Sequence, residues 1–220
     1  MNLTPHYLAL LLKKNQSLNL TSIRDPDEAA LRHIDDALAV YNLFPFSGKS
    51  LIDVGSGGGL PGIPLRLHDP SIQLTLLDAT AKKVVFLQSV CDTLGLSEVC
   101  CIAARAEEQA RVPGFRDAFD VSIARGVAYL PILCELCLPF VRPGGHFLAM
   151  KGKEPAEEVE EAREIVAALG GRVKEIVEYS LKESIQHTLV VIEKVHSTPK
   201  VYPRSWTTIM RRRTSQGAII

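Results

Sequence analysis

Residues 51–62 read Leu-Ile-Asp-Val-Gly-Ser-Gly-Gly-Gly-Leu-Pro-Gly, and this stretch decides the fold. An apolar run that contains the carboxylate of Asp53 leads into five glycines within eight positions. Glycine adopts positive φ readily and lets a ligand approach the backbone. A buried strand that enters such a loop and then a helix predicts an α/β protein with a nucleotide-like ligand at the carboxyl edge of its sheet.

The glycine spacing separates two classes of ligand. A dinucleotide loop requires G-x-G-x-x-G, whose last glycine packs the helix on the strand. Here Gly55, Gly57 and Gly59 are present, but Leu60 occupies the position of that last glycine. Two prolines then delay the start of the helix to about residues 62–64. The resulting wide loop favours S-adenosylmethionine, which has no phosphate, and NAD remains the alternative.

A second carboxylate follows the next apolar run. Residues 74–77 read Leu-Thr-Leu-Leu and end at Asp78. Neighbouring parallel strands end at the same edge of a sheet, so Asp78 is expected beside the glycine loop. Its carboxylate would bind the two hydroxyls of a ribose.

From residue 50 the pattern alternates between strands and helices, which predicts a parallel sheet. Residues 181–187 are too few for a parallel crossover, so the last two strands should form an antiparallel hairpin. We therefore predict a Rossmann-like α/β fold of the class I S-adenosylmethionine-dependent methyltransferase type, with a mostly parallel seven-stranded sheet. The expected strands are 50–54, 73–77, 99–102, 120–123, 146–150, 172–180 and 188–195, and the expected helices are 62–67, 81–94, 130–141 and 154–169.

Three segments are expected along the chain. Apolar residues at helical spacing predict a helix over residues 3–15, and Asp25 followed by proline predicts a second helix from residue 26 to about residue 40. These helices form an N-terminal cap over residues 1–48. Residues 49–196 form the cofactor-binding methyltransferase domain, and residues 197–220 form a basic C-terminal tail.

Composition limits the possible partners and compartments. The 220 residues carry 25 basic and 25 acidic side chains, so binding to nucleic acid must rest on local patches. The N-terminus lacks a secretory signal and no stretch is long enough to span a membrane, which predicts a cytoplasmic protein without membrane contact. Cys134 and Cys137 form a lone C-x-x-C without a second ligand pair, so helix packing is favoured over a zinc site and no metal is expected.

The residues after 196 form such a local patch. They include no acidic residue, and aromatic side chains at positions 202 and 206 lie among the basic ones. Basic and aromatic side chains together suit RNA, because they pair with phosphates and stack on bases. The alternative is a disordered tail that only adds solubility. The residues predicted to bind RNA in this segment are Arg204, Arg211, Arg212 and Arg213.

The tip of the fourth strand, residues 122–126, bears on the methyl acceptor. It lacks the Asn/Asp-Pro-Pro-aromatic cluster of enzymes that methylate exocyclic amines, and the cysteine of enzymes that methylate pyrimidine C5. An acceptor that is already nucleophilic remains, such as guanine N7, which needs only in-line placement. Arg125 is then a candidate catalytic residue that orients the acceptor, or else an ordinary salt bridge. Lys151 and Lys153 suit phosphate contact or, alternatively, simple solubility.

Taken together, these motifs resemble the GidB/RsmG family of bacterial small-subunit (16S) ribosomal RNA guanine-N7 methyltransferases. The resemblance covers about residues 15–195, and its most specific element is the Leu-Pro-Gly-Ile-Pro extension of the glycine loop. The residues that carry it are 19–25 with His33, 53–64, 77–78 with Lys82 and Lys83, 105–108, 124–126 and 151–152.

The resemblance implies methyl transfer from S-adenosylmethionine to guanine N7 in ribosomal RNA or a precursor of the small ribosomal subunit. It also implies that Gly55 and Leu60 contact the methionine portion of the cofactor and that Asp78 binds its ribose. Ala106 and Glu107 would flank the adenine, and Arg125 would lie beside both the cofactor and the target base. Two other functions stay open on this fold: a nucleotide-binding regulatory protein, and a small-molecule methyltransferase.

Overall fold

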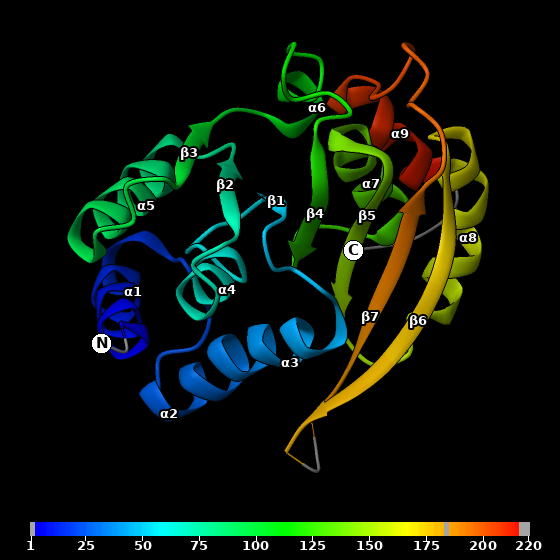
Figure 1. Ribbon diagram of the computed structural model, residues 1–220. Coiled ribbons are helices and arrows are strands. Elements are labelled where there is room, and N and C mark those ends of the chain that lie inside the picture. Colours follow the sequence, from blue (N-terminus) through cyan, green and yellow to red (C-terminus); the bar gives the residue numbers. More distant parts are fainter. Residues whose placement is uncertain (1–2, 183–184, 216–220) are drawn as a thin grey trace.

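A seven-stranded sheet forms the centre of the molecule (Figure 1). The structure is a computed structural model that describes residues 3–182 and 185–215, with side chains up to residue 211. The strand order is β3-β2-β1-β4-β5-β7-β6; β7 runs antiparallel to both of its neighbours, and the other pairs are parallel. This confirms the predicted fold class. The strands are β1 Ser50–Val54, β2 Gln73–Asp78, β3 Cys100–Ala103, β4 Phe119–Arg125, β5 Val141–Lys151, β6 Gly171–Leu181 and β7 Ile185–Lys194.

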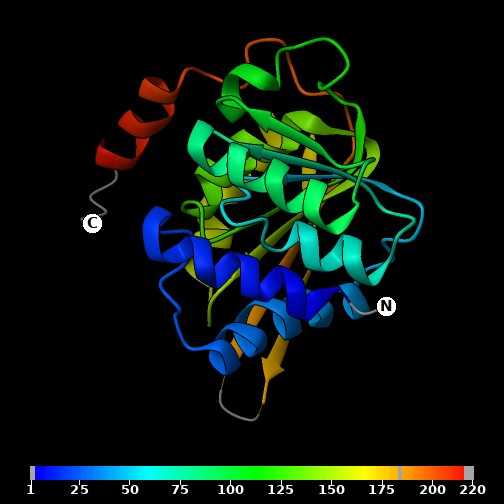
Figure 2. The same ribbon diagram turned by 90° about the vertical axis from the view of Figure 1, so that its left-hand side faces the viewer.

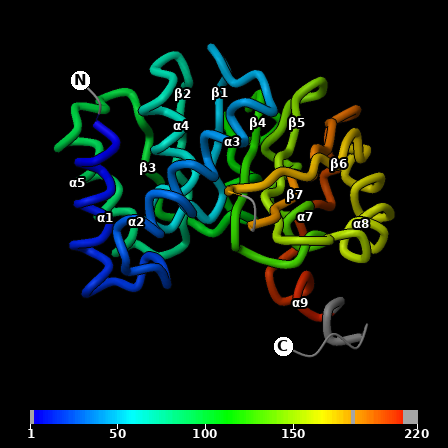
Figure 3. The backbone as a smooth tube through the Cα atoms, turned by 90° about the horizontal axis from the view of Figure 1, so that it is seen from below, coloured from blue at the N-terminus to red at the C-terminus, as the bar shows by residue number. Residues whose placement is uncertain are grey.

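Helices cover both faces of the sheet, as the view from below shows (Figure 3). One group comprises α1 Thr4–Leu18, α3 Asp36–Leu43, α4 Gly62–His68 and α5 Ala81–Leu94. The other comprises α7 Leu130–Cys137, α8 Ala156–Ala168 and α9 Trp206–Ser215, and the short α6 Ala106–Gln109 lies near it.

Two apolar cores result from the alternation of side chains along each strand. Leu51 and Leu148 point into the core under α1, α4 and α5. Their neighbours Ile52 and Phe147 point into the core under α7 and α8. Strands that bury both faces need near-continuous apolar runs, which is what the sequence shows at 51–54 and 74–77.

The predicted N-terminal cap is present and touches the glycine loop. The side chain of Asp25 accepts hydrogen bonds from the backbone N–H groups of Asp27 and Glu28, and so caps α2, Pro26–Ala29. A π-helical stretch, Ala30–Asp35, joins α2 to α3 without a break. On α1, the buried Tyr7 hydroxyl donates to the carbonyl of Gly58 at 2.9 Å, which ties the first helix to the loop after β1.

Most elements differ from the predictions in their bounds, β5 most of all, since it begins at Val141 instead of residue 146, and three differences go further. The helix expected over 130–141 ends as a short 3-10 turn, Leu138–Phe140, because Pro139 lacks an N–H, and Val141 already belongs to β5. The four-residue α6 was not predicted. The segment predicted as a basic tail contains α9, which extends from one end of the molecule (Figure 2) and buries Ile209 in the second core.

Candidate active site

The glycine loop begins where β1 ends and is held by the neighbouring strand. The N–H groups of Gly55 and Ser56 both donate to the carbonyl of Leu77, at 2.8 and 3.1 Å. Gly57 and Gly59 have φ of 55° and 95°, a region that strongly favours glycine. A Cβ on Gly57 would have only the carbonyl oxygen of Gly55 within 4 Å, at 3.9 Å, so this side of the loop is open.

Asp78 at the end of β2 closes the loop from the other side. One carboxylate oxygen accepts from the N–H of Gly57 at 2.9 Å and the other from the N–H of Thr80 at 2.8 Å. The residue is only 6% exposed. A carboxylate has about four lone-pair positions, so Asp78 keeps capacity to accept from two ribose hydroxyls while it holds the loop.

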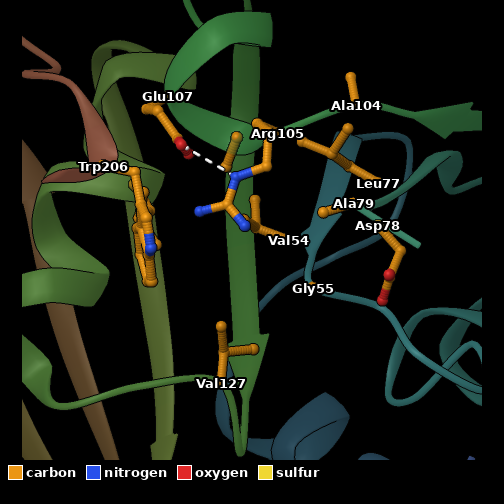
Figure 4. A pocket seen from close by; sticks show the side chains of 12 residues that line it. Val54, Gly55, Leu77, Asp78, Ala79, Ala104, Arg105, Glu107, Val127 and Trp206 are labelled. Carbon is orange, nitrogen blue, oxygen red and sulfur yellow. Dashed lines mark hydrogen bonds and ion pairs between the residues drawn. The ribbon is translucent and has the colours of Figure 1, made fainter.

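A narrow cavity opens beside Asp78 between the ends of β1, β2 and β4 (Figure 4). The space within it, including its open mouth, is about 410 Å³. The cavity brings together four of the predicted cofactor residues: Gly55, Asp78, Ala106 and Glu107. Its walls are mostly apolar and include Val54, Leu77, Ala79, Ala104, Val127 and Leu136.

The other four predicted cofactor residues do not line this cavity. Gly57 and Gly59 are in the loop beside it, and Leu60 packs into the first core with 7% exposure. The side chain of Leu60 therefore anchors the loop, and only its backbone remains for ligand contact. Arg125 also lies outside the residues that form the cavity wall.

Arg105 and Trp206 also line the cavity and were not predicted as cofactor residues. The Nε of Arg105 is 2.9 Å from a carboxylate oxygen of Glu107, and its guanidinium lies 4.4 Å from the centroid of the Trp206 ring. Figure 4 shows this ring at the side of the cavity away from Asp78. No sequence pattern predicts this contact, since Trp206 is far from Arg105 in the chain and lies in a basic segment that we assigned to RNA.

Arg125 is held by the N-terminal cap. Its guanidinium donates to the carbonyl of Arg32 and to Asp36, both at 2.8 Å, and lies 3.1 Å from Nδ1 of His33. The salt bridge that we considered as the alternative is therefore present. The charge of Arg125 also acts on the buried Asp53 beneath the glycine loop, where it partly offsets the rise in pKa that burial causes.

Asp36 is the centre of this acceptor-side cluster, which comprises His33, Asp36, Arg125, Tyr179 and His187. The residue is fully buried. Besides the bond from Arg125, it accepts from the Tyr179 hydroxyl at 2.7 Å and is 3.0 Å from Nδ1 of His187. The cluster thus joins the cap, the tip of β4 and the β6–β7 hairpin. Apart from Arg125, only His33 was singled out beforehand, and then only through the family resemblance.

Two ionisable side chains of this cluster, His33 and Tyr179, have strongly shifted pKa values. Burial, with the charge of Arg125, lowers the pKa of His33 to about 4, so its imidazole is neutral at pH 7. Burial and the adjacent Asp36 raise the pKa of Tyr179 far above its ordinary value, so the phenol keeps its proton. An imidazole with a pKa near 4 is a weak general base at neutral pH.

Asp53 is a buried carboxylate beneath the glycine loop. One oxygen accepts from the N–H of Gly62 at 2.8 Å, and the other has no hydrogen-bond partner. Burial raises the pKa of Asp53 to about 7, partly offset by the Gly62 N–H and the charge of Arg125. The residue therefore responds to pH inside the site region.

Two of the predicted RNA-binding residues are engaged by the protein itself. The Nζ of Lys151 is 2.7 Å from Glu158 and donates to the carbonyl of Ala128. Arg204 pairs with Glu135, whose carboxylate is 1% exposed, through bonds from its backbone N–H and its guanidinium. The charges of both residues compensate neighbouring carboxylates of the protein, and the RNA contacts of Lys151 and Arg204 stay predictions.

The other predicted RNA-binding residues lie at the surface or outside the described side chains. Lys153 is exposed and 3.0 Å from Glu154. Arg211 is exposed on α9. The side chains of Arg212 and Arg213 lie outside the described residues.

The described part of the chain contains neither a membrane-spanning helix nor a cluster of metal ligands. Within it, no helix combines the length and apolar character needed to cross a membrane. The same residues contain no group of three or more His, Cys, Asp or Glu side chains that could hold a metal ion. Cys134 and Cys137 are both fully buried in the second core, as helix packing predicts.

The cavity fits the adenosine portion of S-adenosylmethionine. Apolar walls suit a base, a carboxylate at the edge suits a ribose, and the open side of the glycine loop allows an amino-acid tail to approach the backbone. A dinucleotide would need the N-terminus of α4 for its pyrophosphate. That helix start is blocked, since Gly62, Ile63 and Pro64 are all buried.

Comparison with known proteins agrees with this geometry. A family model described as "GidB: rRNA small subunit methyltransferase G" matches residues 1–189. A protein of Acetivibrio thermocellus named ribosomal RNA small subunit methyltransferase G is 42% identical over 199 residues, which are 90% of this chain and 82% of that protein. A protein of the same name from Desulfitobacterium hafniense is 41% identical over 199 residues, which are also 90% of this chain and 82% of that protein.

Solved structures show the same fold at low sequence identity. A SAM-dependent methyltransferase from Aquifex aeolicus superposes with a TM-score of 0.58 at 18% identity and covers 82% of this chain and 97% of its own. The mitomycin 7-O-methyltransferase MmcR superposes with a TM-score of 0.60 at 16% identity, over 86% of this chain and 60% of its own. These two similarities support the fold alone.

Proposed function

Because the chain belongs to the GidB family of rRNA small subunit methyltransferases, we propose that it transfers a methyl group from S-adenosylmethionine to N7 of a guanine in small-subunit ribosomal RNA. The observation that carries the proposal is the pairing of the glycine loop with Asp78 beside the apolar cavity. A ribosomal substrate would also place the reaction in the cytoplasm.

The protonation states of His33 and Tyr179 support guanine N7 as the acceptor. When bound, S-adenosylmethionine supplies a methyl group from a positively charged sulfur, and guanine N7 accepts it with a free lone pair, so no proton has to leave. An exocyclic amine would require a base. Among the described residues of the acceptor-side cluster, His33 is a weak base and Tyr179 keeps its proton.

Arg125 then acts through position rather than by proton transfer. Its bonds to Arg32 and Asp36 fix the N-terminal cap against the tip of β4, which forms the side of the site where an acceptor base would enter. Holding the acceptor in line with the methyl group lowers the activation free energy of a transfer reaction by a large amount. We therefore place Arg125 in the reaction as the residue that sets this geometry.

The proposed RNA surface comprises Lys153 and the basic residues of α9, of which Arg211 is exposed. Each phosphate contact that releases a counterion adds about 0.7 to the salt slope of binding to single strands. Removing the side chains of residues 211–213 should weaken RNA binding and flatten its salt dependence. An unchanged slope would move the RNA surface to another part of the molecule.

Labelled cofactor tests the proposed reaction. Small ribosomal subunits from cells that lack this activity are incubated with the protein and methyl-labelled S-adenosylmethionine, and the RNA is digested to nucleosides. We expect the label in 7-methylguanosine from small-subunit RNA. Label in another nucleoside contradicts the N7 assignment, and transfer only to small molecules of an extract supports the small-molecule alternative. Cofactor binding without transfer to any acceptor supports the regulatory alternative.

A further inference from the structure

Trp206 lies at the cofactor cavity although it belongs to the C-terminal segment. Its indole lines the cavity, lies against the Arg105 guanidinium, and is 37% exposed (Figure 4). A single exposed indole on a soluble protein needs no explanation. An indole that forms one wall of the cavity beside Asp78, with a cation against its face, does.

Contacts on both sides of Trp206 fix its position. Two residues earlier, Arg204 pairs with the buried carboxylate of Glu135. Three residues later, Ile209 is 2% exposed and packs into the second core. Arg111 also donates to the carbonyl of Pro203. These anchors hold the first turn of α9 against the body, so the indole is presented to the cavity by a supported segment.

The cation against the ring has its own support. Arg105 is oriented by its ion pair with Glu107, which is 6% exposed and belongs to α6. Cation–π contacts of this kind stabilise by about 0.5–1 kcal/mol at exposed sites and more when shielded from water. Arg105 therefore links Trp206 to Ala106 and Glu107, the two positions expected to flank the adenine.

We propose that Trp206 is a cofactor-binding residue whose indole, together with the Arg105 guanidinium against it, forms the wall that contacts the adenine of S-adenosylmethionine. The C-terminal helix is then part of the cofactor site. This inference rests on the proposed function only in taking S-adenosylmethionine as the ligand. Aromatic side chains stack on any base, and the loss of such a stack on truncation to alanine is large enough to measure.

The chain contains one tryptophan, so its tryptophan fluorescence reports on this wall alone. The protein is titrated with S-adenosylhomocysteine, with adenosine and with methionine, and fluorescence and heat of binding are recorded on the same samples. We expect S-adenosylhomocysteine to change the fluorescence with the dissociation constant given by calorimetry. Adenosine should also change it, and methionine should not.

The titration distinguishes failure of the inference about Trp206 from failure of the proposed function. Heat of binding with S-adenosylhomocysteine at saturation, without any change in fluorescence, overturns the role of Trp206 and leaves the proposed function intact. Absence of heat with both S-adenosylhomocysteine and S-adenosylmethionine overturns the proposed function and the inference with it.

Variants test the same wall without relying on fluorescence. Trp206→Ala should weaken S-adenosylhomocysteine binding about tenfold, in the range for loss of base–aromatic stacking, whereas Trp206→Phe should stay within about threefold. Val201→Ala is the matched control, because Val201 lies in the same segment, is 65% exposed and is outside the cavity. It should leave affinity unchanged. If Trp206→Ala and Trp206→Phe both bind like the wild type, the inference is wrong.

Discussion

The two halves of the site are built in different ways. The cofactor half consists of the glycine loop and Asp78, and backbone N–H groups make most of its bonds. The acceptor half is the cluster around Asp36, in which side chains from the cap, β4 and the β6–β7 hairpin bond to one another. A backbone loop fixes a shape that many proteins share, whereas a side-chain cluster can be assembled only by this arrangement of elements.

This difference leads to a division of labour that mutations can test. Changes in the cofactor half should act on cofactor affinity. Changes in the acceptor half should act on stability and on turnover, because they loosen the cap from the sheet without altering the cavity.

The largest effect is expected for Gly57→Val, which should abolish measurable S-adenosylhomocysteine binding in calorimetry. The new side chain would fill the open side of the loop and resist the φ of 55°. Gly95→Val is the matched control, since Gly95 caps the end of α5 with φ of 69° and open space around it. It should bear a similar backbone penalty and keep full affinity. Full affinity in folded Gly57→Val protein would refute the loop assignment.

Asp36→Ala should lower the free energy of unfolding by about 3–5 kcal/mol, because it leaves the Arg125 guanidinium without its buried partner. Urea unfolding monitored by circular dichroism measures this change. Asp35→Ala, at the exposed neighbouring position, should stay within about 0.5 kcal/mol of the wild type. Equal, small effects of the two substitutions would mean that the cluster does not hold the cap.

Asp53 gives a pH-dependent prediction. Its pKa of about 7 in the folded protein exceeds its ordinary value of 3.8, so between these values the folded state keeps a proton that the unfolded state has released. The contribution of Asp53 to stability is thus full below about pH 4 and is lost as pH rises through about 7. The loss amounts to about 4 kcal/mol at most, at about 1.4 kcal/mol per pH unit.

Asp53→Asn should remove this loss. Unfolding free energies of wild type and variant, compared at about pH 5 and about pH 8, measure the difference. We expect the free energy of unfolding of the variant, relative to that of the wild type, to increase as the pH rises. A constant difference across this range would show that Asp53 is ionised in the folded protein throughout.

Asp78→Asn should weaken S-adenosylhomocysteine binding by about 1.5–3 kcal/mol, the value of hydrogen bonds to a charged group. The free energy of unfolding should fall as well. The amide nitrogen that replaces one carboxylate oxygen cannot accept a hydrogen bond, so the bond from the N–H of either Gly57 or Thr80 is lost. Asp92→Asn, an exposed carboxylate on α5, is the control for charge alone. A loss of stability with unchanged affinity would make Asp78 a loop residue only.

The part of the site that is built from residues close together in the chain was predicted from the sequence. The loop over 55–60 and the strand end at Asp78 lie close together in the chain, and parallel strands bring their ends to one edge, so composition and spacing predicted this half. The bounds of α5 and β1 were also predicted correctly.

The rest depends on contacts between distant segments. Asp36, Tyr179 and His187 read as ordinary residues of a helix and two strands until the hairpin is folded over the cap. Arg204 and Trp206 stood out as parts of a basic and aromatic segment, and the sequence did not show that Glu135 and Arg105, far away in the chain, contact them. Composition describes the charge of a segment, but not the partner that the fold supplies.

The division of labour is tested most directly by Arg125→Lys, which keeps the charge but loses the planar fork that bonds Arg32 and Asp36. The dissociation constant of S-adenosylhomocysteine and the single-turnover methylation rate at saturating cofactor and small subunits are measured on the same protein. The account predicts an affinity within about twofold of the wild type and a rate about a hundredfold lower, as expected for a misplaced acceptor. A parallel loss of affinity with an unchanged rate at saturation would contradict it.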